Sequence, residues 1–226
     1  MTGIQTAIAA SALGLAIAAG TSVEWLASRE PARARFWFDS VTFQVARPSR
    51  QLQGQLTPAE IQQIERVAEV EVLQAFAGLR LAFSDHPQSA YQVRVVQDLP
   101  PRLGPRPLAA GESVALGPLG NQGWVSFRSV SGLALSYAPR DADRATVIDS
   151  IGRGIGRVAA HEFAHQILPG ADLHASADPE SYEYASADRR TLFYGRLDWS
   201  LAGSLLTRRL SVEAADPATA LAARTP

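Results

Sequence analysis

The most regular hydrophobic pattern lies in residues 57–79, TPAEIQQIERVAEVEVLQAFAGL. Its apolar positions recur every three or four residues: Ile61, Ile64, Ala68, Val72 and Phe76. This spacing predicts an amphipathic helix docked on a core. Thr57 is a good N-cap, Pro58 suits the first helical position, and Glu60 completes a capping box, so the helix begins at this point.

Shorter stretches rich in aromatic and β-branched residues predict strands. They are residues 35–45 (RFWFDSVTFQV), 80–83 (RLAF), 91–96 (YQVRVV), 123–130 (GWVSFRSV) and 133–139 (LALSYAP). We expect Ser131 and Gly132 to form the turn between the last two strands. Residues 99–122 are rich in proline and glycine and predict a long loop, of the kind that often borders a functional cleft.

The second half of the chain has helical patterns. The first helix is predicted to begin at Asp143 and to end at Pro169-Gly170. Its three glycines, at 152, 154 and 156, do not have phosphate-loop spacing and indicate either a close helix-packing face or a helix break. A second helix, capped by Asp178, is expected to run to about residue 194, and a third to cover 199–210. This order predicts an α+β fold with one domain over residues 21–210, a cleft between its halves, and a disordered tail at 211–226.

The N-terminal segment Ile4–Gly20 is apolar, rich in alanine and free of charge. It is shorter than a typical membrane span and resembles the hydrophobic region of a signal peptide, although it lacks a positive start. We therefore expect residues 1–20 to be a signal peptide or a membrane anchor, and the protein to be secreted, periplasmic or membrane-anchored. A core or amphipathic helix in a cytoplasmic protein is the alternative.

The amino-acid composition argues against several kinds of function. The net charge of -1 gives no basic surface for nucleic acid, and the absence of cysteine excludes disulfides and thiolate chemistry. Any metal site must therefore use histidine or carboxylate ligands.

Residues 161–174, HEFAHQILPGADLH, contain three of the four histidines. His161 and His165 are four residues apart, hence one turn apart on the same helical face. Two imidazoles at that spacing suit zinc, which prefers nitrogen and oxygen ligands. Glu162 would reach a zinc-bound water, whose pKa falls toward about 7, and would take its proton as general base.

The segment resembles the active-site helix of zincin metallopeptidases, in a likeness of motifs covering residues 123–195. It implies a zincin-like α+β domain with an N-terminal twisted mixed sheet and helices, the active-site helix, and a small, mostly helical C-terminal part. Metzincins continue as HExxHxxGxxH, but Leu168 and Ala171 stand at the last two of these positions. The gluzincin pattern, in which a glutamate of the next helix completes the site, is closer.

The third ligand implied by this resemblance is Glu183, on the predicted second helix. Asp188 would then hydrogen-bond a ligand histidine, as the aspartate that follows the glutamate does in gluzincins. His174, folding back past the turn, is the alternative, and an aspartate, Asp172 or Asp188, is the third possibility. Tyr194 is a candidate donor to the oxyanion, with Tyr182 and Tyr184 nearby in sequence.

The sequence thus predicts a zinc-dependent metallopeptidase with a peptide or protein substrate. The ligands would be His161, His165 and Glu183, with Glu162 as the general base. The alternatives are an inactive zincin-shaped binding module and a metal-binding protein that is not a peptidase. A protein that binds no metal is the simplest rival.

Overall fold

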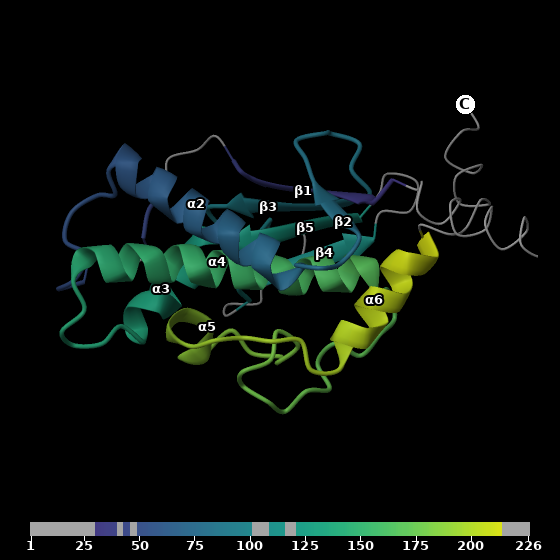
Figure 1. Ribbon diagram of the computed structural model, residues 1–226. Coiled ribbons are helices and arrows are strands. Elements are labelled where there is room, and N and C mark those ends of the chain that lie inside the picture. The colour runs from purple at the N-terminus through teal and green to yellow at the C-terminus, as the bar shows by residue number, and fades with distance from the viewer. Residues whose placement is uncertain (1–29, 40–42, 46–48, 101–108, 116–120, 214–226) are drawn as a thin grey trace, which may run out of the picture.

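The computed structural model describes residues 30–39, 43–45, 49–100, 109–115 and 121–213. A five-stranded mixed sheet forms one layer of the molecule, and helices lie against it (Figure 1). The strands are β1 (Ala32–Phe38), β2 (Leu81–Phe83), β3 (Tyr91–Val96), β4 (Gly111–Ala115) and β5 (Asn121–Ser126). The helices are α2 (Pro58–Ala75), α3 (Phe127–Ser136), α4 (Arg144–Ile167), α5 (Thr191–Tyr194) and α6 (Ala202–Glu213). The predicted α+β class is confirmed.

The strands are arranged in the order β2-β1-β3-β5-β4. The first four in this order run parallel, and β4 pairs antiparallel with β5 at the edge. The sequence predicted a loop over residues 99–122. This prediction was wrong for Gly111–Ala115, which form β4. GESVA, the sequence of β4, has one strongly β-branched position, so its extended conformation depends on pairing with β5 rather than on intrinsic propensity.

Alternation of side chains gives the sheet one apolar face. In β3, Val93 and Val95 are fully buried, whereas Arg94 between them is half-buried on the opposite face. In β1, Ala34 is buried and Arg35 is half-buried. The apolar face packs against the helices, and the core lies between them.

Helices α2 and α4 form the centre of the helical layer, side by side (Figure 1). The predicted capping box of α2 is present, with Thr57 and Glu60 each bonded to the other's backbone N–H. Helix α4 is continuous through its glycines: Gly152 and Gly156 form a close packing face against α2, and Gly154 packs closely on Phe193 of α5. An added Cβ at Gly152 would lie 2.7 Å from the Ile64 carbonyl oxygen, and one at Gly156 would meet the carbonyl oxygen of Ala68. The helix-packing interpretation of these glycines is confirmed.

The strand predicted for 133–139 and the end of the one predicted for 123–130 were wrong, because Phe127–Ser136 form helix α3. Ser126 caps the helix by accepting a hydrogen bond from the Ser129 N–H at 3.1 Å. Phe127, Val130 and Ala134 are fully buried at helical spacing. In a segment this short, the apolar positions fit both the periodicity of a strand and that of a helix, and the serine cap favours the helix.

The helix predicted from Asp178 was also wrong. Residues 178–190 form turns, and only α5 is helical. Side chains compete for the backbone N–H groups: Asp178 accepts from the N–H of Glu180 at 2.8 Å, and Ser186 from that of Asp188 at 3.1 Å. In addition, the Tyr182 N–H donates to the Asp198 carbonyl oxygen at 3.1 Å, which ties the segment to a distant part of the chain.

The predicted third helix is present as α6, which runs to Glu213 and so covers the first residues of the tail predicted to be disordered. The signal peptide or anchor predicted for residues 1–20, and residues 214–226 of the predicted tail, lie outside the described residues. Among the residues that the structure describes, no helix has the length and apolar character needed to cross a membrane.

Candidate metal centre

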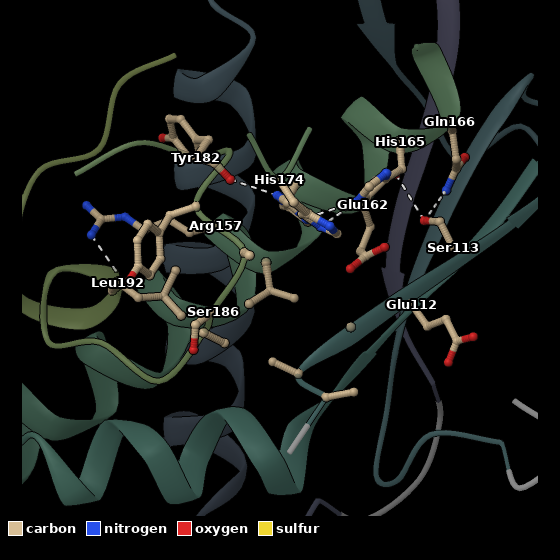
Figure 2. Close-up of a pocket in the computed structure, with 18 of the residues that line it drawn as sticks. Glu112, Ser113, Arg157, Glu162, His165, Gln166, His174, Tyr182, Ser186 and Leu192 are labelled. Atoms are coloured by element: carbon tan, nitrogen blue, oxygen red, sulfur yellow. Dashed lines mark hydrogen bonds between the residues drawn. The ribbon is translucent and has the colours of Figure 1, made fainter. Parts of the chain in front are cut away.

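Three histidine side chains converge at the C-terminal half of α4. The Nε2 atoms of His161 and His165 are 3.0 Å apart. The Nε2 atom of His174 lies 3.1 Å from the first and 3.2 Å from the second. We call these three residues the histidine cluster. Figure 2 shows His165 and His174 directed toward one another in a cleft between α4 and strand β4. The first two come from adjacent turns of α4, as their spacing predicts.

A tight turn after α4 places the third histidine. Gly170 has a φ of +84°, a left-handed conformation that other residues rarely adopt, and the Ala171 N–H donates to the Leu168 carbonyl oxygen. Leu173 is buried and anchors the returning chain in the core. The His174 N–H donates to Asp172 at 3.1 Å. His174 therefore reaches the two helical histidines from outside the helix.

A backbone carbonyl sets the tautomer of His161. Its Nδ1 lies 2.7 Å from the carbonyl oxygen of Tyr182, which can only accept a hydrogen bond. Nδ1 therefore carries the proton, and Nε2 of the neutral ring presents a lone pair to the other two histidines. Metal-binding histidines are commonly oriented by such a contact.

The environment keeps the two helical imidazoles neutral. Burial lowers the pKa of His161 to about 3, helped by the nearby charge of His165 and, to a smaller extent, of His174 and Arg189. Burial also lowers the pKa of His165, with the charge of His174 as the second cause. Neutral imidazole is the form that binds metals.

The spacing of the cluster fits a metal ion. Tetrahedral zinc with nitrogen ligands at about 2.0–2.1 Å separates those nitrogens by about 3.3–3.4 Å, close to the 3.0–3.2 Å found. A proton shared by two of the three nitrogens would leave the third lone pair without a partner, whereas one cation satisfies all three. Among the described residues, this is the group of three or more potential ligand side chains that converge closely enough to hold a metal.

Glu162 lines the same cleft, next to the first histidine (Figure 2). Its carboxyl group packs on the backbone of β4, so that an added Cβ at Gly111 would lie 2.5 Å from its Oε1. Burial raises the pKa of Glu162 to about 8, opposed by a hydrogen bond from Ser113 and aided by the charge of Glu112. A carboxyl group with a raised pKa is suited to accept and release a proton near neutral pH.

Hydrogen bonds fix α4 against the sheet beside the cluster. The Gln166 side chain accepts from the Gln92 N–H at 2.9 Å and donates to the Gln92 carbonyl oxygen at 3.0 Å on β3. Ser113 of β4 donates to the backbone carbonyl oxygen of Glu162 at 3.0 Å. Gly123 of β5 leaves room for both side chains, because a Cβ there would lie 2.8 Å from Gln166 Nε2. These residues were missed from the sequence, where they carry no local signal.

Glu183, the third ligand predicted from the sequence, is not brought into the cluster. Its side chain is buried, and its carboxylate accepts hydrogen bonds from Ser181 Oγ and the Leu201 N–H, both at 2.9 Å. It also accepts from Ser200 Oγ and from the Ala202 N–H. These contacts hold the start of α6, where anionic groups are favoured. His174 takes the position that the sequence assigned to Glu183.

The other candidates have different partners. Asp188 accepts a hydrogen bond from the Tyr137 hydroxyl at 2.8 Å and lies on the surface, so it is not the companion of a ligand. Asp172 contacts the backbone of His174 rather than the cluster. The Tyr194 hydroxyl donates to Ala134 and Ser150, outside the cleft, which removes it as an oxyanion donor. Tyr184 lines the cleft instead.

The cleft around the cluster has a volume of about 660 Å³. Strand β4 forms one wall, and the turns of residues 182–189 form part of the other. Arg157 lies beneath the second wall, bonded to Glu71 at 2.8 Å and to the carbonyl oxygens of Thr191 and Leu192 at 3.0 and 3.1 Å (Figure 2). The two walls leave the histidines accessible from between them.

Comparison with known proteins gives no assignment. No family model matches the chain, and searches of curated proteins and of solved structures found no match. A functional proposal therefore depends on the geometry of the site itself.

Proposed function

We propose that the protein is a zinc-dependent, zincin-like peptidase whose ligands are His161, His165 and His174. The observation that carries the proposal is the convergence of three Nε2 atoms within 3.2 Å of one another in an open cleft. Three protein ligands are the number that catalytic zinc sites use, and structural sites use four. The preference for zinc follows from the all-imidazole donor set.

Glu162 is the general base in this proposal. Zinc held by the three imidazoles supplies positive charge that polarises a carbonyl group and lowers the pKa of a bound water toward about 7. Glu162 takes a proton from the attacking water onto its carboxyl oxygen and then passes it to the leaving amine nitrogen. The position of Glu162 in the same cleft, next to His161, supports this role.

Other residues position these groups. The Tyr182 carbonyl holds the His161 ring so that Nε2 faces the cleft, and Ser113 holds the backbone of Glu162. An extended peptide fits along the cleft beside β4, with Glu162 below it.

The first test measures zinc by mass spectrometry after the purified protein is stripped with chelator and reloaded. We expect about one zinc in the wild type and its loss in His161→Ala and His174→Ala. His86→Ala is the matched control, because His86 is exposed on a loop and its side chain accepts a hydrogen bond from the Gln88 N–H, away from the cluster. A wild type that takes up no zinc would refute the proposal.

The second test measures hydrolysis of a quenched fluorescent peptide library. We expect activity that chelator abolishes and zinc restores. Glu162→Gln should keep its zinc and lose about 100-fold or more in rate, the contribution typical of a general base. Zinc binding without any turnover would favour the inactive binding module, and turnover unchanged in Glu162→Gln would remove Glu162 from the mechanism.

A further inference from the structure

Arg189 is a buried cation that forms no ion pair within the described part of the chain, although the charge of Asp178 acts on it from a greater distance. Its side chain is 8% exposed, and its Nη1 donates to the Pro179 carbonyl oxygen. Its Nε is buried without a hydrogen-bond partner, and the guanidinium lies 5.0 Å from the ring of Tyr184. No ion pair in the described part of the chain includes Arg189. Burial lowers its pKa to about 10, as expected for a cation whose charge is poorly compensated.

The neighbouring buried arginine provides a contrast. Arg157 is 6% exposed and also lines the cleft, but it forms an ion pair with Glu71 at 2.8 Å and bonds two carbonyl oxygens. The fold therefore neutralises one arginine of the cleft and leaves the other. An isolated buried charge is costly, so its retention in a cleft indicates an anionic ligand.

The position of Arg189 gives that ligand a place in the site. Arg189 lines the same cleft as His161 and Glu162. The opposite wall is strand β4, whose Glu112 side chain points away from the histidines (Figure 2). The charge of Arg189 would therefore hold the anionic part of a bound molecule against the wall formed by residues 182–189.

We propose that Arg189 forms a carboxylate-binding subsite of the cleft, and that the substrates are peptides with a carboxylate at the corresponding position. A guanidinium matches a carboxylate in geometry and binds it more strongly than a neutral group. An aspartate or glutamate side chain and a free C-terminus both supply this group. The assignment of these peptides as substrates depends on the proposed peptidase function, whereas the subsite itself depends on Arg189 alone.

The test measures peptide binding by fluorescence anisotropy to full-length, zinc-loaded Glu162→Gln, which binds without turnover. One pool of labelled octapeptides carries a single glutamate, placed at each position in turn. The second pool carries a single glutamine at the same positions. Each pool is made with a C-terminal acid and with a C-terminal amide. We expect carboxylate-bearing peptides to bind about tenfold or more tightly than the neutral glutamine amides. Preference for the glutamate amides identifies a side-chain carboxylate, and preference for the acids identifies the C-terminus.

Arg189→Gln should remove this preference and keep both the zinc and the affinity for neutral peptide. Arg190→Gln is the matched control, because it removes the same charge one residue away at an exposed position outside the cleft. Arg189→Lys, which keeps the charge, should retain part of the preference and guards against misfolding of the glutamine variant. Equal binding of acidic and neutral peptides, or a preference that persists in Arg189→Gln, overturns the subsite.

The two proposals fail in different ways. Zinc uptake without a carboxylate preference overturns the subsite and leaves the peptidase proposal in place. A carboxylate preference that depends on Arg189 in a protein without zinc supports the subsite and overturns the peptidase.

Discussion

Two substitutions separate the structural role of Glu183 from the proposed metal-binding role of His174. In Glu183→Ala, the buried hydrogen-bond network at the start of α6 is lost, while the histidine cluster is untouched. In His174→Ala, one nitrogen of the cluster is lost from an exposed side chain. We expect opposite effects on stability and on zinc.

The magnitude follows from the bonds of Glu183. A hydrogen bond to a charged group contributes about 1.5–3 kcal/mol, and a helix cap about 0.5–2 kcal/mol. The contributions are not additive, because water replaces the lost acceptor at the exposed Ser200 and Leu201 but not at the buried Ala202 N–H. We therefore expect Glu183→Ala to lower the free energy of unfolding by about 2–4 kcal/mol. For His174→Ala, a surface change, about 0.5 kcal/mol or less is expected.

Urea unfolding in excess chelator, followed by the fluorescence of the four tryptophans, measures the stability of the metal-free protein. With a slope of about 2 kcal/mol per molar urea, the midpoint of Glu183→Ala should fall by about 1–2 M. Zinc content is measured separately on reloaded protein below each midpoint, and Glu183→Ala should keep about one zinc that His174→Ala loses. Glu180→Ala is the control, because its side chain is exposed on the same segment.

The reverse pattern would refute the assignment. If Glu183→Ala lost its zinc and kept its stability, the carboxylate would be a ligand and the cluster of three histidines would not be the metal site. If both variants lost zinc without loss of stability, the site would contain a fourth protein ligand.

Three further predictions concern the packing and charge around the site. Gly156→Leu should destabilise by about 3 kcal/mol or prevent folding, since its side chain would meet a backbone carbonyl of α2, as thermal melts would detect. Gly111→Ala should keep zinc but reduce peptide hydrolysis at least about tenfold, because the added Cβ would displace the carboxyl group of Glu162. The hydrogen bond from Arg144 lowers the pKa of Glu60 to about 2, so its stabilisation is complete above the unfolded pKa of about 4.5 and disappears as the pH falls toward 2. Urea unfolding should show Glu60→Gln about 1–3 kcal/mol less stable at pH 7 and equal to wild type near pH 2; an equal deficit at both would contradict this.

The long helices could be predicted because their signals are local and redundant. α2 has a capping box and five apolar positions in register, and α4 has a cap at Asp143 and a stop at Pro169-Gly170. The prediction was wrong where the decisive contacts are distant. Residues 178–190 have helical composition, but the backbone of Tyr182 pairs with Asp198. In addition, an aspartate and a serine side chain in this segment each accept a hydrogen bond from a backbone N–H group.

The same distinction applies to the candidate site. His161 and His165 lie on one helical face, so their convergence follows from helix geometry alone, and Glu162 is the next residue of the same turn. The approach of His174 depends on a left-handed glycine and a buried leucine in the following turn, and the sequence offered it only as an alternative. The residues that β4 contributes to the site could not be predicted, because no local sequence pattern indicated that this strand pairs with β5.

The segment of residues 181–183 explains why Glu183 was a reasonable but misplaced choice. Tyr182 turns its backbone carbonyl to His161, so this segment does border the cluster. The next side chain points the other way, to the N–H groups that begin α6, and those donors occupy both of its oxygens. A ligand must direct a lone pair toward the cleft, whereas the Glu183 carboxylate is directed at the hydroxyl and N–H donors around the start of α6. The contribution of this segment to the histidines is therefore made by the backbone of Tyr182, and Glu183 stabilises the fold that holds that backbone in place.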